Sequence, residues 1–323
     1  MDILRLLSDG QFHSGVQLAE IMGVSRTTIS KRITQWAAHG LVIDSVVGKG
    51  YRLHSPIQWL DKERILSVIP KAIQQYISIF ETHAYVSSTN DVVATYLSKN
   101  TQSGVVCIAE MQGAGRGRRG REWSSPPAGN FYGSVGWVFK EGFSAIEGLS
   151  LAVGVAVIKA LESMGAQDLQ LKWPNDVLYR GHKVAGVLIE MTGEADGACQ
   201  VVIGVGVNLH LPETIKQQIT QPVTDLYTIC GQLIERQLIT AAIVSELIAL
   251  LIDYHKTGFM KWHDEWLKYD AFKDQSVVII GMQEPINGIA QGVDEHGNFL
   301  LETKKGLMHI CGGEVSLRQA KSS

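Results

Sequence analysis

Hydrophobic residues in the first 55 positions recur at helical spacing in three short runs, at Ile3 to Leu7, Val16 to Ile21 and Ile29 to Ala37. Serine precedes the second and third runs where a helix N-cap is expected, and a four-residue turn containing glycine separates them. Residues 41 to 53 then alternate around a glycine-rich turn and predict two short strands. Together these elements predict a winged helix-turn-helix.

The exposed face of the third predicted helix is polar and basic, as expected for a helix that enters the major groove of DNA. We expect operator contacts from Lys49 at the tip of the wing and from residues at the start of this helix, namely Ser25, Arg26, Thr27, Thr28, Ser30 and Lys31. A small helical module that packs against another protein would have the same pattern, so this alternative stays open.

The pattern changes after residue 60, where strand-like and helix-like segments are mixed. Helices are expected at 61–69, 91–98, 149–164 and 239–254, and strands at 105–110, 131–139, 169–173, 183–191 and 200–207. Strand clusters interspersed with helices predict an α+β domain with one mixed sheet and helices mainly on one of its faces.

The last 50 residues contain only short strand candidates, at 276–280, 286–293, 299–302, 307–311 and 315–317, separated by Gly-rich turns. This pattern predicts a small β-barrel of the SH3 type. The expected domains are therefore a winged-helix DNA-binding domain at 1–60, an α+β domain at 61–270 and a β domain at 271–323.

Composition limits the classes of protein to consider. The chain has 323 residues, 45% of them hydrophobic, which is enough for two or three folded domains. The formal charge is -3, so a nucleic-acid partner must be met by a local surface. The four cysteines form no Cys-x-x-Cys pair, and neither a leader nor a membrane segment is recognisable, since the most apolar run, Ile243 to Ile252, is short. A cytoplasmic protein is expected.

Candidate chemistry is concentrated in residues 113 to 121, Gly-Ala-Gly-Arg-Gly-Arg-Arg-Gly-Arg. Glycines let a backbone approach a ligand closely, and arginines offer charged forks to carboxylate or phosphate. A disordered basic loop is the alternative. A dinucleotide fingerprint is excluded because Pro126 and Pro127 prevent a following helix, and a Walker loop is excluded because no Gly-Lys-Ser or Gly-Lys-Thr triplet follows.

Five further motifs stand at predicted strand ends or in loops: Ser88-Thr89-Asn90 before a helix, Gln112 before the glycine-arginine loop, Lys172-Trp173-Pro174-Asn175-Asp176, Lys183-Val184-Ala185-Gly186, and Gly204-Val205-Gly206-Val207-Asn208. Ser88 or Thr89 is expected to cap the helix that follows. A plain capping role and a solvated surface role are the structural alternatives for the serine-threonine pair and the lysines.

These motifs, in this order after a winged helix, resemble the bifunctional biotin-protein ligase and biotin operon repressor family over almost the whole chain. The resemblance implies that biotin and ATP give biotinyl-5'-AMP and pyrophosphate, and that a lysine of the biotin carboxyl carrier protein of acetyl-CoA carboxylase then takes the biotinyl group. It also implies that biotinyl-AMP acts as corepressor and promotes a homodimer on the operator. Joining two anions requires several fixed cations, and Mg²⁺ is expected on the phosphates, with no metal site built from protein side chains.

The resemblance also assigns roles to residues. It implies catalysis by Lys183, Arg118 and Arg116, and biotin contacts from Ser88, Thr89, Asn90, Gln112, Arg116, Gly117, Arg118 and Lys183. It implies ATP or adenylate contacts from Arg119, Arg121, Trp123, Lys172, Asn175, Asp176 and Asn208. The chain departs from the family pattern at Gln221-Pro222-Val223, where relatives have an aromatic residue over adenine, so what covers adenine stays open.

Two other functions compete with this interpretation. A non-catalytic regulator that only senses biotin would not need so many convergent cations. A lipoate-type ligase shares the acyl-adenylate chemistry, but the glycine-arginine loop and the DNA-binding unit count against it.

Overall fold

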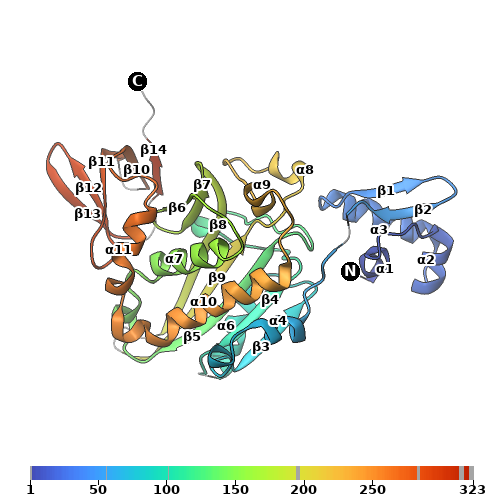
Figure 1. Ribbon diagram of the computed structural model, residues 1–323, viewed down its shortest axis with the longest axis horizontal. Coiled ribbons are helices and arrows are strands. Elements are labelled where there is room, and N and C mark those ends of the chain that lie inside the picture. Colours follow the sequence, from blue (N-terminus) through green and yellow to red (C-terminus); the bar gives the residue numbers. More distant parts are fainter. Residues whose placement is uncertain are drawn as a thin grey trace.

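The computed structural model describes residues 2–55, 57–100, 102–193, 197–281, 284–312 and 316–319. The chain forms three units along its long axis, with the N-terminal unit at one end and the C-terminal strands at the other (Figure 1). The predicted boundaries near 60 and 270 fall in the connections between these units.

The N-terminal unit is a winged helix-turn-helix, as predicted, formed by α1 (Asp2–Leu7), α2 (Gly15–Met22), α3 (Arg26–Ala38), β1 (Ile43–Val46) and β2 (Gly50–Leu53). The hydroxyl of Ser14 accepts a hydrogen bond from the backbone N–H of Gln17, and Ser25 does the same for Thr28, so both serines cap their helices. Its apolar residues form a separate core around Leu4, Leu18 and Ile29.

The middle unit is built on a seven-stranded mixed sheet in the order β3-β4-β5-β9-β8-β7-β6. Its strands are β3 (Ile79–His83), β4 (Val105–Ala109), β5 (Phe131–Phe139), β6 (Leu169–Lys172), β7 (Asp176–Tyr179), β8 (His182–Gly193) and β9 (Cys199–Val207). Only β3 and β4 are parallel, and every other pair is antiparallel. The mixed sheet confirms the prediction, although β3 and β7 were not expected, because β3 has only two apolar residues and β7 is only four residues long.

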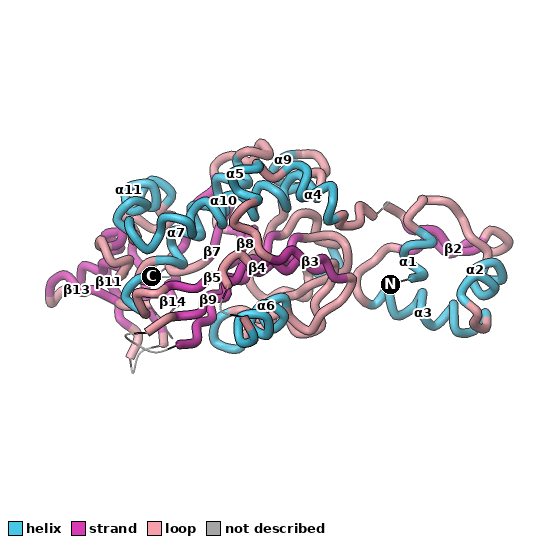
Figure 2. Tube along the Cα trace, turned by 90° about the horizontal axis from the view of Figure 1, so that it is seen from below, coloured by secondary structure: helices cyan, strands magenta, loops and turns pink. Residues whose placement is uncertain are grey.

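Most helices cover one face of this sheet, and α6 (Thr89–Lys99) covers part of the other (Figure 2). The first group comprises α4 (Lys62–Val68), α5 (Lys71–Gln74), α7 (Leu149–Glu162), α10 (Arg236–Thr257) and α11 (Met260–Tyr269), with short α8 (Glu213–Lys216) and α9 (Leu226–Cys230) in the connection before α10. Two single 3-10 turns, η1 (Arg118–Gly120) and η2 (Phe143–Ile146), complete the helical structure of the described residues.

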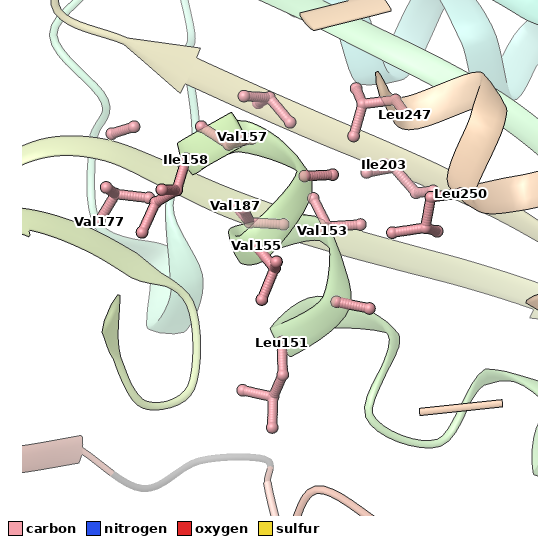
Figure 3. Packing of buried hydrophobic residues seen from close by; sticks show 14 of the residues in the cluster. Leu151, Val153, Val155, Val157, Ile158, Val177, Val187, Ile203, Leu247 and Leu250 are labelled. Atoms are coloured by element: carbon pink, nitrogen blue, oxygen red, sulfur yellow. The ribbon is translucent and has the colours of Figure 1, made fainter. Parts of the chain in front are cut away.

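The main core lies between the sheet and helices α7 and α10. Val153 and Val157 of α7 and Leu247 of α10 pack with Val187 of β8 and Ile203 of β9 (Figure 3). The 22-residue α10 is longer than the apolar run noted in the sequence. It is the one described helix long and apolar enough to cross a membrane, but twelve of its residues are buried in this core. It is therefore a core helix.

The C-terminal unit is a five-stranded antiparallel sheet in the order β13-β12-β11-β10-β14, formed by β10 (Ser276–Ile280), β11 (Ile286–Val293), β12 (Phe299–Thr303), β13 (Gly306–Ile310) and β14 (Ser316–Gln319). The predicted last strand began at Val315, which lies outside the described residues. The unit is joined to the middle one by a hydrogen bond from the Trp173 indole Nε1 to the Gly297 carbonyl, at 3.1 Å.

The N-terminal unit contacts the middle unit at the end of α3. Gly40 is buried, and a Cβ added there would lie 2.7 Å from Cγ1 of Ile215 in α8. The connecting segment is held as well, because Arg236 donates to the Gln58 carbonyl and Gln237 to the Trp59 carbonyl.

Candidate active site

Two glycines of β9 form the floor of the candidate site. Side chains alternate across a strand, so Val201, Ile203 and Val205 face the core while Gly204 and Gly206 face the side of the sheet that carries α6. A Cβ at Gly204 would lie 2.4 Å from Oδ1 of Asn90, and a Cβ at Gly206 would lie 2.4 Å from Cε2 of Trp123. Glycine is therefore required here for close approach.

One wall of the site is the beginning of α6. Ser88, Thr89 and Asn90 are all buried, with exposures of 3–4%. The side-chain oxygen Oε1 of Gln112 accepts from the backbone N–H of Thr89 at 2.9 Å and from its hydroxyl at 3.2 Å. Thus Gln112 caps α6 from 23 residues away, and the expectation that the Ser88 or Thr89 side chain caps this helix is wrong.

A buried hydroxyl that was not predicted supports this wall. The hydroxyl of Ser134 in β5 donates to Asn90 Oδ1 at 2.6 Å and lies 2.7 Å from the hydroxyl oxygen of Thr89. Its only signal in the sequence is a polar residue in an otherwise apolar strand. The side chains of this wall are fixed before any ligand binds.

The glycine-arginine loop forms a closed hairpin over the floor. Arg116 pairs with Glu122 in an antiparallel bridge, and the backbone N–H of Trp123 donates to the Gly115 carbonyl at 2.9 Å. The turn of the hairpin is η1, in which Arg119 has a φ of 61°. The indole of Trp123 lies on Gly206 and Gly186, and its buried Nε1 has no hydrogen-bond partner among the described residues.

Cations gather at the other side of the floor. Lys183, at the beginning of β8, forms an ion pair with Asp176 of β7 at 2.6 Å, and their side chains are only 14% and 17% exposed. The ammonium lies 5.1 Å from the ring centre of Trp123. The backbone of Lys183 is fixed by the second loop, since its N–H donates to the Pro222 carbonyl and its carbonyl accepts from Thr224.

Arg118 reaches the same region from the hairpin and donates to Oδ1 of Asn175 at 3.3 Å. Burial lowers the pKa of its guanidinium, and the nearby Asp176 opposes this shift. Arginine keeps its charge through any such shift at neutral pH. The structure thus brings Arg118, Lys183, Asn175 and Asp176 together beside Trp123.

Arg116 has a different environment. Its guanidinium pairs with Asp91 of α6 at 2.7 Å and with Glu190 of β8 at 3.2 Å. The hydrogen bond and charge of Asp91 raise the pKa of Arg116, and Arg116 in turn lowers the pKa of the Asp91 carboxyl. Neither carboxylate was expected from the sequence to take part in the site.

The remaining predicted residues lie at the edges of this arrangement. Arg119 and Arg121 are exposed on the hairpin. The Lys172 ammonium lies 5.9 Å from the ring centre of Phe272, toward the C-terminal unit. Asn208 is buried and donates its amide N–H to the Thr224 carbonyl, so it holds the second loop in place. The described residues contain no group of three or more His, Cys, Asp or Glu side chains suited to a metal ion.

The predicted DNA-contacting residues form one exposed surface of α3 and the wing. Arg26, Thr27, Ser30 and Lys31 are exposed, whereas Ile29 on the opposite side of the helix is buried. The hydroxyls of Ser25 and Thr28 bond to each other at 2.9 Å at the beginning of the helix. Lys49 is exposed at the wing tip, with its ammonium 5.8 Å from the ring centre of Phe12.

Comparison with known proteins accounts for all three units. Residues 83–208 match the biotin/lipoate A/B protein ligase family, residues 1–52 an HTH domain and residues 274–318 the biotin protein ligase C-terminal domain. The chain is 37% identical to the bifunctional ligase/repressor BirA of Salmonella typhimurium over 99% of this chain and 98% of the relative. This chain belongs to the bifunctional ligase/repressor family. The family relationship extends to BirA of Bacillus subtilis, at 28% identity over 98% of both chains.

Solved structures of the ligase part agree. The biotin protein ligase from Aquifex aeolicus in complex with biotin and ATP aligns with a TM-score of 0.63 and 28% identity, covering 76% of this chain and all of that one. Its ligand-free structure aligns at 0.62 with 26% identity, over 75% of this chain. The middle and C-terminal units of this ligase/repressor family member therefore share the fold of a biotin ligase.

Proposed function

We propose that this protein activates biotin with ATP to biotinyl-5'-AMP and transfers the biotinyl group to a lysine of the biotin carboxyl carrier protein of acetyl-CoA carboxylase. With biotinyl-AMP bound, it binds the biotin operator and represses transcription. The observation that carries the proposal is the glycine floor between a buried polar wall and a cluster of cations, in a chain of this family that also has an exposed basic helix in a winged helix-turn-helix.

The polar wall is suited to a ring with amide-like groups. The Ser88, Thr89, Asn90 and Gln112 side chains are proposed to bond the ureido group of biotin, which offers both donors and a carbonyl acceptor. Thr89 and Gln112 are hydrogen-bonded to each other, and Asn90 is hydrogen-bonded to Ser134 and Glu190, so these three side chains lose little freedom on binding. Gly117 and Trp123 are proposed to cover the ligand from the hairpin.

The cation cluster is suited to the reacting groups. Attack of the biotin carboxylate on the α-phosphorus of ATP forms the acyl-phosphate bond and releases pyrophosphate, and negative charge builds up around phosphorus. We propose that Lys183 and Arg118 offset this charge, while Asp176 holds the Lys183 ammonium near the floor. The carrier lysine amine then attacks the acyl carbon and releases AMP. No side chain of the ligase itself acts as a nucleophile.

The remaining predicted contacts are proposed for the nucleotide. Arg119 and Arg121 are exposed on the hairpin, Asn175 lies in the cation cluster, Lys172 ends β6, and Asn208 supports the second loop. Mg²⁺ would be bound mainly by the ATP phosphates, because Mg²⁺ usually takes only one or two protein ligands. Asp176 would be the carboxylate of the cation cluster that faces it. The metal ion would withdraw negative charge from the phosphates.

The regulatory half of the proposal rests on the N-terminal unit. Residues 1–55 carry six Lys or Arg against four Asp or Glu, a net +2, so a single unit is expected to hold one operator half-site weakly. A homodimer promoted by biotinyl-AMP would join two such units. The outer strands β3 and β6 of the sheet are proposed for this contact, which the carrier protein would compete for. A cytoplasmic location fits this role.

Isotope exchange between pyrophosphate and ATP tests the enzymatic half. Exchange is expected with biotin and not with lipoate, and Lys183→Ala should slow adenylate formation by about 3 kcal/mol in barrier height, as loss of one charge-stabilising donor does. Exchange with lipoate would favour the lipoate-type ligase. No exchange, together with tight binding of biotin, would favour a regulator that only senses biotin.

A further inference from the structure

The two arginines of the hairpin that were expected to contact biotin have opposite surroundings. Arg118 lies in the cation cluster near Lys183 and one carboxylate. Arg116 is bound to two carboxylates, with its Nη1 and Nη2 forming a fork on Asp91 at 3.2 and 2.7 Å and its Nη2 also 3.2 Å from Glu190. The two carboxylates offset the positive charge of the Arg116 guanidinium and accept hydrogen bonds from its Nη atoms, which weakens its attraction for an anionic ligand.

Both carboxylates belong to the fixed scaffold. Asp91 lies in the first turn of α6, next to the buried wall of the site. Glu190 lies on β8 and accepts from the amide Nδ2 of Asn90 at 2.7 Å. Asn90 is 3% exposed, and its Oδ1 accepts from Ser134 at 2.6 Å. Glu190 is therefore held in place by Asn90 of the wall, and Asp91 directly follows Asn90 in α6.

Arg116 itself belongs to the hairpin. It is joined to Glu122 by the bridge between the two strands of the hairpin, and Gly115 beside it accepts from Trp123, which covers the floor. The ion pairs of Arg116 thus connect the covering hairpin to both sides of the wall, one carboxylate on α6 and the other on β8.

We propose that Arg116 is a latch that holds the hairpin closed over the biotinyl-adenylate through Asp91 and Glu190, and that it is a positioning residue without direct contact to the reacting atoms. The proposal rests on the function proposed above for its ligand. The closed hairpin retains the activated intermediate until the carrier protein arrives.

Removal of the Asp91 charge distinguishes a latch from a substrate contact by the sign of its effect. If Arg116 binds the anionic ligand, Asp91 competes for it, and Asp91→Asn should slow release of the ligand. Release should also be slower if Asp91 acts only as a negative charge that repels the anionic ligand. If Arg116 is a latch, Asp91→Asn weakens closure and should speed release.

The first experiment measures the dissociation rate of biotinyl-adenylate by the fluorescence change of the full-length protein. Asp91→Asn and Glu190→Gln should each raise this rate by about fivefold, the range for partly exposed ion pairs with a forked geometry. In an Arg116→Met background, Asp91→Asn should have no further effect. Comparing Asp91→Asn in the parent protein and in Arg116→Met separates the ion pair with Arg116 from any effect of Asp91 on the stability of α6. Slower or unchanged release from Asp91→Asn in the parent protein would overturn the proposal.

A second experiment needs no ligand. Trypsin cleaves after Arg118, Arg119 and Arg121, which lie on the hairpin and remain in all variants. Cleavage of the ligand-free protein at these sites should be about fivefold faster in Asp91→Asn than in the parent protein, by the same loss of an ion pair. Equal cleavage rates would mean that the ion pairs do not hold the hairpin.

The two experiments separate this proposal from the proposed function. A protein that fails the pyrophosphate exchange test with biotin but shows faster tryptic cleavage in Asp91→Asn has a latch and a different ligand. A protein that passes the exchange test but shows unchanged cleavage and release in Asp91→Asn is a biotin ligase without this latch.

Discussion

A buried ion pair ties together several chain segments behind the candidate site, and its removal should be costly. The guanidinium of Arg236, in the first turn of α10, donates to Oε2 of Glu110 at 2.7 Å, to the Gln58 carbonyl at 2.6 Å and to the Asn130 carbonyl at 2.9 Å. Both charged side chains are nearly inaccessible, at 6% and 5% exposure. Glu110 ends the strand before the hairpin, and Gln58 belongs to the connection from the DNA-binding unit.

Arg236→Met keeps most of the side-chain volume but leaves the Glu110 carboxylate buried with the backbone N–H of Leu60 as a remaining partner. Breaking a buried pair from one side costs about 3–5 kcal/mol because the other charge stays uncompensated. We expect a loss of this size in the free energy of unfolding of the middle unit at pH 7, measured with urea and followed by tryptophan fluorescence.

Two comparisons make the test specific. Glu110→Gln should destabilise the parent protein but stabilise the Arg236→Met variant, because it removes the buried charge that the first change left unpaired. Arg64→Met removes the same side chain from a neighbouring ion pair with Glu235, in which the side chains are 59% and 33% exposed, and it should cost less than Arg236→Met, about 1 kcal/mol. If Glu110→Gln further destabilised Arg236→Met, the uncompensated charge would not be the cause of the loss.

Three further changes test other parts of the structure. The pKa of Asp225 in the folded protein is lowered: burial alone would raise it, but hydrogen bonds from Thr228 and Lys216 outweigh that effect. The Asp225 carboxylate therefore stabilises the fold above the ordinary Asp pKa, and this stabilisation is lost as pH falls through the pKa of the folded state. Asp225→Asn should therefore cost about 2 kcal/mol in urea unfolding at pH 7, with a difference that shrinks below about pH 4. Gly206→Ala should weaken biotin binding in calorimetry at least about tenfold, the range for overpacking, because its Cβ would meet Trp123, while Gly312→Ala in the C-terminal unit, whose Cβ would meet nothing within 4 Å, should bind as the parent does. Lys49→Ala should reduce the slope of operator affinity against salt by about one, measured across a salt series, and an unchanged slope would remove the wing from the DNA contact surface.

Elements with strong local signals could be predicted closely. The predicted spans 131–139, 276–280 and 286–293 coincide with β5, β10 and β11. β5 and β10 are rich in β-branched or aromatic residues, and β11 begins and ends with a β-branched residue and is followed by a turn. The helix α11 (Met260–Tyr269) was not predicted, because it is rich in charged residues and its apolar face is narrow. Trp262 and Trp266 are the buried side chains of that face.

The candidate site shows a similar division. Glycines and cations could be identified from their motifs, because those residue types in dense runs are unusual for a scaffold. Their partners could not be identified, because they are distant in sequence: Gln112 caps α6 across 23 residues, and Arg116 meets Glu190 across 74. Pairing at that distance depends on the order of strands in the sheet, which hydrophobic periodicity does not determine.

The DNA-binding unit and the candidate ligand site share their supports at two places. Gly40 at the end of α3 packs against Ile215, which lies in the same connection as the Pro222 carbonyl that holds the backbone of Lys183. On the other side, Glu110 at the base of the hairpin accepts from Leu60 and, through Arg236, is joined to Gln58. The connection that contains Ile215 and Pro222 and the side chain of Glu110 therefore each contact both the base of the ligand site and the chain that leads to the winged helix. We expect substitutions at Ile215 or Glu110 to change operator binding as well as ligation.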